Sequence, residues 1–307
     1  MAKQPDGLVS IKDFVRWGAS RFNAEGLFFG HGADNAIDEA AQLVLSALHL
    51  QPDLPATFQD CRLTEAERGT VVELIERRLT ERLPAAYLTG CAWFAGLEFA
   101  VDSHVLVPRS PIAEVIETGF HPWIAPEVIG RVLDLCTGSG CIGIAAAVWL
   151  PDAEVDLVDV SPEALSVARQ NVERHGVGDR VRVLESDLFD GLHGNHYDVI
   201  VSNPPYVSRS ELESLPLEYH REPRLGLLGG DDGLDLVVRI LGEADRFLTD
   251  EGVLIVEVGS SAETLERRLP EVPFTWLELE RGGDGVFILT REQLVESQPL
   301  VEEVLGL

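Results

Sequence analysis

The sequence predicts an α/β protein in which helices cover both faces of a mostly parallel sheet, with a small helical domain in front. Two observations carry this prediction. From about residue 131 onward, short apolar runs alternate regularly with helical stretches, as in a doubly wound sheet. Residues 8–82 show only the helical period. A chain of 307 residues is long enough for one large domain and a smaller one.

The strands of the predicted sheet share a buried apolar run ended by a polar or turn residue. They are residues 131–136, 155–159, 181–186, 197–202, 253–258, 274–280 and 286–290. A helix at 234–248 precedes the fifth strand. Residues 281–285, a short glycine-rich link, join the last two strands, and a link this short predicts antiparallel neighbours. The sheet is therefore expected to be mixed, followed by an acidic helical tail that packs loosely.

The region before the sheet is expected to form helices and a hairpin. Ile11 and Phe14 fall on one helical face, residues 40–50 form an apolar helix, and Thr64 has the pattern of a capped helix start. His31 lies between two of these helices, where a capping loop is a more common structure than a metal site. Residues 87–101 alternate large and small side chains and turn near Ala95, which predicts a β-hairpin. We thus expect a helical domain at 1–84, a hairpin linker at 85–110 and a larger domain at 111–307.

The composition points to a soluble protein with an unusual charge. The chain has 24 Lys and Arg against 52 Asp and Glu, a net charge of −28. Such a chain should be repelled by bare nucleic acid and by anionic lipid, and a basic protein is the more natural partner, although an acidic surface also serves solubility or a salt-rich habitat. The amino terminus shows no signal core and no apolar run is long enough to span a bilayer, which predicts a cytoplasmic location. The four cysteines lack metal-ligand spacing and are expected to be buried free thiols.

An apolar strand at 197–202 ends abruptly in Asn203, Pro204, Pro205 and Tyr206. Each proline fixes its own φ and restricts the residue before it, so Asn203 and Pro204 should be held extended at the carboxyl end of the strand. Open α/β sheets bind ligands at that end. Two carbonyl oxygens, from the Asn203 side chain and the Pro204 backbone, beside the Tyr206 ring suit a planar NH2 group.

A glycine loop follows the first strand of the sheet. Gly138, Gly140 and Gly143 match the dinucleotide-binding spacing, and Asp159 ends the second strand, where an acid can bind a ribose. A nicotinamide dehydrogenase is therefore one alternative. Asn203 to Tyr206 has no role in hydride transfer, which argues against it.

Two further acids favour a different cofactor. Asp134 lies just before the loop, where a carboxylate can orient the loop and, through water, hold the amino group of an amino acid tail. Asp187 follows the third strand and can accept from an adenine amino group, although it could instead cap a helix. We infer S-adenosylmethionine as the cofactor. Its methyl group would be transferred to a poor nucleophile such as an amide nitrogen, because the site offers no strong base, cysteine nucleophile or metal cluster.

These motifs resemble one known family. Asp134 to Gly140 together with Asn203 to Tyr206, after a helical domain and a hairpin, are similar to the HemK/PrmB family of protein glutamine methyltransferases. The resemblance implies a class I methyltransferase fold with a seven-stranded mixed sheet. It also implies methylation of a glutamine amide in a Gly-Gln context, with Asn203 and Pro204 holding the amide and Tyr206 packing on it.

The resemblance also bears on the target. Residues 17–22, 30–35, 107–111, 219–223 and 282–287 look like the branch that modifies the third protein of the large ribosomal subunit. The other branch, which acts on release factors, usually has an acidic residue soon after its Pro-Arg pair, where this chain has Ser110 and Pro111. The helical domain is expected to recognise the substrate. Independently of the resemblance, residues 207–232 form a long polar segment directly after the site, which predicts a lid or clamp, with plain disorder as the alternative.

The residues expected to form the site fall into two groups. The catalytic and substrate-binding residues are Asn203, Pro204, Pro205, Tyr206 and, as a loop charge or a placed contact, Arg109. The residues that bind the cofactor are Asp134, Thr137, Gly138, Ser139, Gly140, Cys141, Asp159, Val160, Asp187, Leu188 and Asn203. No metal is expected.

Two rival functions belong to other classes. A nucleic-acid methyltransferase can use the same Asn-Pro-Pro-Tyr motif on an exocyclic base amine, but the sequence shows neither a basic patch nor a recognition domain. A ribosome-assembly factor without catalytic activity could retain the fold as a platform. The intact glycine loop argues against that function.

Overall fold

The computed structural model describes residues 7–306, and its contacts divide the chain into two compact units. The first unit comprises residues 1–92, 101–103 and 216–222, and the second comprises the remainder. Residues 1–6 and 307, which include the start of the predicted helical domain and the end of the tail, lie outside the described part. The functional division at residues 84 and 110 stays a prediction.

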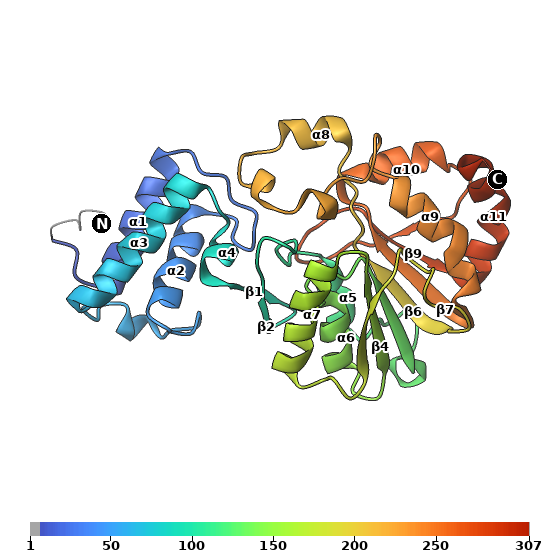
Figure 1. Cartoon of the computed structure of the whole chain (residues 1–307), viewed down its shortest axis with the longest axis horizontal. Helices are drawn as coiled ribbons and strands as arrows, with labels where there is room; N and C mark the ends of the chain where they lie inside the picture. The colour runs from blue at the N-terminus through green and yellow to red at the C-terminus, as the bar shows by residue number, and fades with distance from the viewer. Residues whose placement is uncertain (1–6, 307) are drawn as a thin grey trace. The chain divides into compact units, whose positions relative to one another are not determined.

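The first unit is helical, as predicted (Figure 1). Its helices are α1 (Ile11–Ala24), α2 (Ala36–Ala47), α3 (Glu65–Glu81) and α4 (Ala85–Thr89). The predicted cap of α3 is confirmed, because the Thr64 hydroxyl accepts from the Glu67 amide and the Glu67 carboxylate accepts from the Thr64 amide. Asn35 caps α2 in the expected loop, where its side chain accepts from two backbone amides.

A fully buried arginine of α3 lies inside this helical unit. Arg78 forms ion pairs with Glu39 and, at 3.5 Å, with Glu218, and it donates to the Phe28 carbonyl at 2.9 Å. Glu218 also accepts from Arg82 at 3.2 Å. These contacts explain why residues 216–222, which follow the Asn-Pro-Pro-Tyr motif by only ten positions, group with the helices.

The hairpin is shorter than predicted. It consists of β1 (Cys91–Phe94) and β2 (Leu97–Ala100), and the chain turns at Ala95 and Gly96, which both have positive φ. Residues 87–89, expected to start the first strand, are helical instead and belong to α4.

The second unit contains the predicted seven-stranded mixed sheet, in the order β5-β4-β3-β6-β7-β9-β8. The strands are β3 (Arg131–Leu135), β4 (Glu154–Asp159), β5 (Val181–Glu185), β6 (Tyr197–Ser202), β7 (Leu248–Glu257), β8 (Thr275–Trp276) and β9 (Val286–Thr290). The pairs from β5 to β7 are parallel, and β9 is antiparallel to both β7 and β8. The antiparallel end is therefore confirmed, although β8 is only two residues long.

Helices cover both faces of this sheet, and successive residues of each strand point to opposite sides (Figure 1). In β6, Val199 and Val201 enter one apolar core and Ile200 enters the other. The first core includes residues of α5 (Ile112–Glu117), α6 (Cys141–Trp149) and α7 (Pro162–His175). The second includes residues of α9 (Asp235–Glu243), α10 (Ala262–Arg268) and α11 (Arg291–Leu305). A further short helix, α8 (Arg209–Ser214), lies in the segment predicted to be a lid.

The carboxyl-terminal helix corrects one prediction. It was expected to pack loosely, but Leu294 and Val301 are buried in the second core and Gln298 donates to the Leu241 carbonyl of α9 at 3.0 Å. The many acidic residues of its exposed face obscured, in the sequence, an apolar stripe that packs on α9 and β7.

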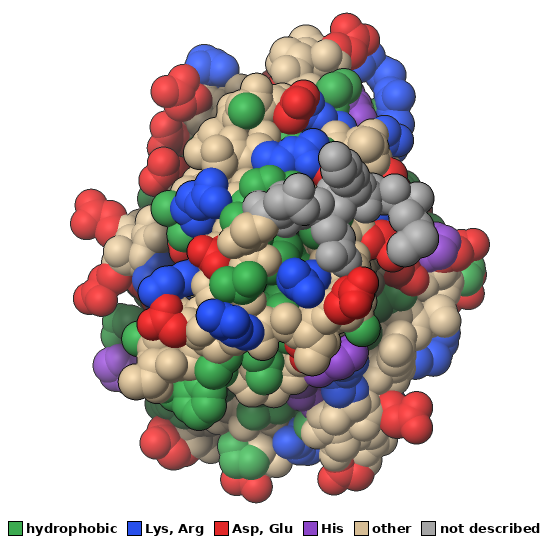
Figure 2. Space-filling model, turned by 90° about the vertical axis from the view of Figure 1, so that its left-hand side faces the viewer, with side chains coloured by type: hydrophobic (Ala, Val, Ile, Leu, Met, Phe, Trp, Pro, Cys, Tyr) green, Lys and Arg blue, Asp and Glu red, His purple; other side chains and the backbone are tan. Residues whose placement is uncertain are grey.

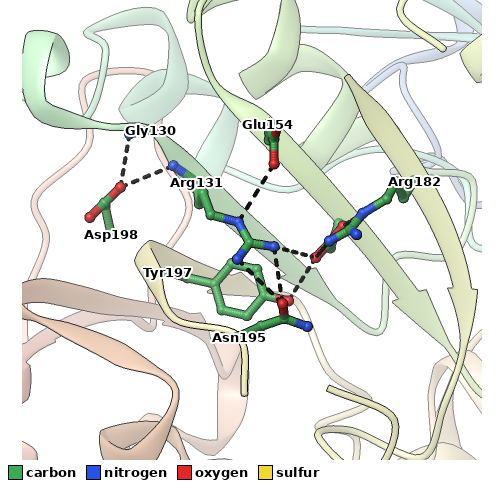
Figure 3. A network of polar contacts seen from close by, with 8 residues as sticks. Gly130, Arg131, Glu154, Arg182, Asn195, Tyr197 and Asp198 are labelled. Carbon is green, nitrogen blue, oxygen red and sulfur yellow. Dashed lines mark hydrogen bonds and ion pairs between the residues drawn. The ribbon is translucent and has the colours of Figure 1, made fainter. Parts of the chain in front are cut away.

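A polar network lies near the amino ends of the parallel strands (Figure 3). Asp156 of β4 accepts two hydrogen bonds of 2.7 Å from Arg182 and one of 2.7 Å from the Tyr197 hydroxyl. Arg131 adds a 3.4 Å contact and lies over the Tyr197 ring, 5.0 Å from its centroid. Asn195 accepts from Arg131, so every member of this network has a partner.

The charge is unevenly distributed along the chain. Residues 1–92 contain 9 Lys and Arg against 13 Asp and Glu, so most of the net charge of −28 comes from the rest of the chain. Figure 2, which faces the helical unit, shows Lys and Arg side chains interspersed with acidic ones. No helix in residues 7–306 combines the length and the apolar character needed to cross a bilayer.

Candidate active site

The two predicted motifs lie side by side because they follow paired residues of neighbouring strands. Ser202, the last residue of β6, is in register with Leu135, the last residue of β3, and its hydroxyl donates to the Leu135 carbonyl at 2.8 Å. Asn203 and Cys136 therefore leave the sheet together. The strand order reverses between β3 and β6, and open sheets bind ligands at this point.

The glycines after β3 have different surroundings. A Cβ on Gly140, which has a φ of +81°, would lie 2.9 Å from Ile144, and one on Gly143 would lie 2.2 Å from Leu157. These two glycines let α6 pack closely against β3 and β4. A Cβ on Gly138 would meet no described atom within 4 Å, so the loop is open there. The amides of this loop start α6, as in loops that hold anionic or polar ligands.

Asp134 is completely buried beneath this loop. One oxygen, Oδ2, accepts from the Thr137 hydroxyl at 2.5 Å and from the Gly143 amide at 2.9 Å. The other oxygen, Oδ1, has no partner among residues 7–306. Burial raises the pKa of this carboxyl to about 7. The expectation that Asp134 orients the loop is supported by these bonds, and one of its oxygens stays unsatisfied.

Asp159, the last residue of β4, binds the same loop from the side. Its Oδ2 accepts from the Gly138 amide and its Oδ1 from the Ser161 amide, both at 2.9 Å. Burial raises the pKa of Asp159. Val160, predicted to contact the cofactor, is exposed. Asp159 and Val160 thus lie next to Gly138, where the glycine loop has free space beside it.

Asp187 lies further out, after β5, and is half-exposed. It forms an ion pair with Arg239 of α9 at 3.0 Å, which the sequence did not indicate. Leu188 is buried with a φ of +48°, an uncommon conformation for leucine that is found more often at functional sites. The Ser186 amide donates to the Asp159 carbonyl at 3.1 Å, which ties this turn to the end of β4.

The Asn-Pro-Pro-Tyr motif has two buried prolines between two partly exposed residues. The Asn203 side chain has no hydrogen-bond partner within the described range of 7–306. Tyr206 is held at both ends, since its hydroxyl donates to Glu257 at 3.0 Å and its carbonyl accepts from the Ser261 hydroxyl at 2.7 Å. The motif is therefore rigid except at the Asn203 amide.

Sequence reasoning missed two buried residues near the carboxyl ends of the strands. Glu257 ends β7 and accepts from Tyr206 and, at 2.6 Å, from the Ser110 hydroxyl. A carboxylate that ends an apolar strand, as Asp159 does, was the available signal. Asn171 is buried in α7, where it donates to the Ser139 carbonyl at 2.9 Å and accepts from the Ala100 amide at 2.7 Å. No local pattern distinguishes it from an exposed helical asparagine.

Arg109 and the cysteines complete the predicted set. The Arg109 guanidinium donates to the Val107 carbonyl at 3.2 Å, and its charge opposes the rise in the pKa of Glu257 that burial causes. Cys141 is buried, and burial raises its pKa to about 12, so it is an uncharged thiol. The expectation that all four cysteines are buried is wrong for Cys61, which is exposed, and Cys91 and Cys136 are only partly buried.

Comparison with known proteins identifies the family. Residues 122–215 match the family model described as "Methyltransferase small domain". A protein of Francisella tularensis subsp. tularensis is 49% identical over 298 residues, 96% of this chain and 95% of that protein. A protein of Xanthomonas campestris pv. campestris is 52% identical over 303 residues, 99% of this chain and 98% of that protein. Both are named "Ribosomal protein uL3 glutamine methyltransferase".

Similarity to solved structures is lower. The "Human methyltransferase 10 domain containing protein" aligns with a TM-score of 0.47 at 19% identity, over 64% of this chain and 89% of that chain. The seven-stranded mixed sheet and the family match confirm the predicted class I methyltransferase fold. With relatives at about half identity over nearly its whole length, the chain belongs to the family of ribosomal protein uL3 glutamine methyltransferases.

Proposed function

We propose that this protein transfers a methyl group from S-adenosylmethionine to the side-chain amide nitrogen of a glutamine in ribosomal protein uL3. The names of its relatives support the reaction and the target. The observation that carries the proposal is the pairing of Ser202 with Leu135, because the Asn-Pro-Pro-Tyr motif and the glycine loop follow these paired residues, which supports an amide acceptor next to a bound cofactor. A ribosomal protein substrate would place the reaction in the cytoplasm.

The residues around the glycine loop fit this cofactor. Asp134 has a buried oxygen without a partner, which a cationic amino group can satisfy directly or through water. Asp159 lies where it can accept from ribose hydroxyls, and Asp187 lies one strand further along. The remaining residues proposed to line the site are Thr137, Gly138, Ser139, Gly140, Cys141, Val160, Leu188 and Asn203. When bound, S-adenosylmethionine supplies an electrophilic methyl group on a sulfonium centre.

The acceptor side is built for an amide. The Asn203 Oδ1 and the Pro204 carbonyl can accept from the two N–H groups of a glutamine side chain, while the Tyr206 ring packs on its plane, with Pro205 keeping the corner stiff. An amide nitrogen is a weak nucleophile because its lone pair is delocalised. Acceptors already fixed around it stabilise the positive charge that develops as it attacks. Alignment of nucleophile and methyl group contributes much of the remaining acceleration.

The charge of the chain is consistent with a basic protein as substrate. The second unit, which contains all the proposed site residues, carries most of the acid excess. An acidic surface attracts a basic ribosomal protein and speeds its encounter. Arg109 is the proposed exception, a positive charge placed to contact the substrate.

A methylation assay tests the proposal directly. Labelled S-adenosylmethionine is incubated with the protein and, in parallel, with purified uL3, a peptide-chain release factor, ribosomal RNA and DNA. We expect label in uL3, and mass spectrometry should place one methyl group on a glutamine. Label in the release factor alone would assign the other branch, and label only in nucleic acid would overturn the proposal. Absence of cofactor binding by calorimetry would instead indicate a platform without catalytic activity.

A further inference from the structure

Glu257 is a buried carboxylate whose cost the fold does not explain. It ends β7, where it is in register with Val286 of β9, and it is only 5% exposed. Within residues 7–306 it forms no ion pair, although the charge of Arg109 acts on it, and its two oxygens accept from the hydroxyls of Ser110 and Tyr206. Burying a carboxylate against neutral hydroxyls costs free energy that an apolar residue would avoid. Such a residue is expected where function requires it.

The hydroxyl that Glu257 holds belongs to the aromatic residue of the acceptor motif. The Tyr206 ring is also confined from the side, because a Cβ on Gly259 would lie 2.6 Å from its Cε2 atom. Gly259 in turn touches Gly285, where a Cβ would lie 2.4 Å from the Gly259 carbonyl oxygen. The glycine-rich link before β9 thus brings backbone close to the tyrosine ring, and Glu257 accepts the hydrogen bond of its hydroxyl at 3.0 Å.

We propose that Glu257 is a positioning residue of the methyl transfer, which fixes the plane of the Tyr206 ring against the glutamine amide through the Tyr206 hydroxyl. Ser110 holds the second oxygen of Glu257 and so sets the direction of the carboxylate. This inference rests on the proposed function, since Tyr206 must pack on the acceptor amide. It adds to that function a residue whose hydrogen bonds go to Ser110 and Tyr206, and not to the glycine loop or Asn203.

A physical consequence separates this role from a purely structural one. If Glu257 acts through Tyr206, its loss should lower kcat and leave the affinity for S-adenosylmethionine unchanged, because the glycine loop does not contact it. If Glu257 only stabilises the fold, its replacement by an apolar residue of similar volume should leave kcat of the folded protein intact.

The test uses Glu257→Leu, Glu257→Gln, Tyr206→Phe and the double variant of Tyr206→Phe with Glu257→Leu. We expect Glu257→Leu to lower kcat on uL3 by about tenfold, the loss of a hydrogen bond to a charged group. Glu257→Gln should recover most of this loss because its amide oxygen can still accept from Tyr206. The double variant should be no slower than Tyr206→Phe alone, since the carboxylate acts through a hydroxyl that is then absent.

Glu154→Leu is the matched control, because it makes the same substitution at an exposed position, the first residue of β4, at the opposite end of the parallel strands. It should leave kcat unchanged. Calorimetry with S-adenosylmethionine and thermal unfolding verify that each variant is folded and binds the cofactor. Wild-type kcat in a folded Glu257→Leu protein, or additive losses in the double variant, would overturn the inference. Failure of the wild type to methylate any glutamine would instead contradict the proposed function, and the inference with it.

Discussion

Asp134 and Asp156 are buried carboxylates on neighbouring strands of one sheet, yet their surroundings differ. Asp156, near the amino ends of the strands, accepts from two arginines and a tyrosine, and both of its oxygens are satisfied. Asp134, near the carboxyl ends, accepts from one hydroxyl and one amide, and one of its oxygens has no partner in residues 7–306. A carboxylate whose two oxygens both have partners serves the fold, while an oxygen without a partner is a polar atom available for a ligand.

The largest effect on turnover is expected at the carboxyl ends of the parallel strands, where Asn203 lies. Asn203→Ala removes a side-chain acceptor that the fold itself does not use, so folding should be unaffected and kcat should fall by about 10²-fold or more, as for other preorganised groups. Affinity for S-adenosylmethionine should stay within a few fold, because the cofactor loop is separate. Turnover and calorimetry on the same preparation measure both quantities. An equal loss of turnover and affinity would contradict the role given to Asn203.

A substitution near the amino ends of the strands should instead lower stability and leave turnover unchanged. Asp156→Ala leaves Arg131 and Arg182 without their shared partner, and we expect the free energy of unfolding to fall by about 3 kcal/mol. This loss is at the lower end for buried ion pairs, because both arginines are partly exposed and can regain water. Denaturant unfolding measures the loss. Turnover per folded molecule should stay at the wild-type level, and a reduced value there would break the comparison.

Asp134→Asn tests the other buried aspartate, which lies near the carboxyl end of β3. The amide retains the size and one acceptor of the side chain but not its charge, so affinity for S-adenosylmethionine should fall by about tenfold. The free energy of unfolding at pH 7 should not fall, because burial disfavours the charged form of this carboxyl and the amide carries no charge. Calorimetry and denaturant unfolding provide the two values, with Asp156→Asn as control. A variant that is unstable but binds the cofactor normally would reverse the roles of the two aspartates.

The pH dependence of stability gives a finer test. The pKa of Asp134 rises from 3.8 to about 7 on folding, so between these values the unfolded chain loses a proton that the folded protein keeps. The contribution of Asp134 to stability is full below pH 4 and is lost as the pH rises toward 7. Relative to Asp134→Asn, the wild type should therefore lose at most about 1.4 kcal/mol of unfolding free energy for each pH unit. Parallel unfolding curves for both proteins at pH 5 and pH 6 would show that burial of Asp134 does not raise its pKa.

Elements with a strong local signal could be predicted from the sequence. The strand at Tyr197–Ser202 and the caps of α2 and α3 match the structure, because prolines, capping residues and apolar periods act over a few residues. The position of Asn203 at the end of β6 and that of the glycine loop after β3 were predictable for the same reason.

Other features depend on contacts between distant segments. Asp156 is 26 residues from Arg182 and 41 from Tyr197, and Arg78 is 140 residues from Glu218, so no local pattern reveals either network. The same reason explains why residues 216–222 were assigned to a lid of the larger domain. Glu257 was missed because a single acid at a strand end becomes informative only when its neighbours Ser110 and Tyr206 are known.

The hydrogen bond between Ser202 and Leu135 has a consequence for how this family can diverge. The glycine loop and the Asn-Pro-Pro-Tyr motif follow paired residues of adjacent strands. The distance between them is therefore set by backbone pairing in the sheet and not by the conformation of a loop. Surface segments can consequently be exchanged to recognise a new protein while the distance that the methyl group must cross stays constant.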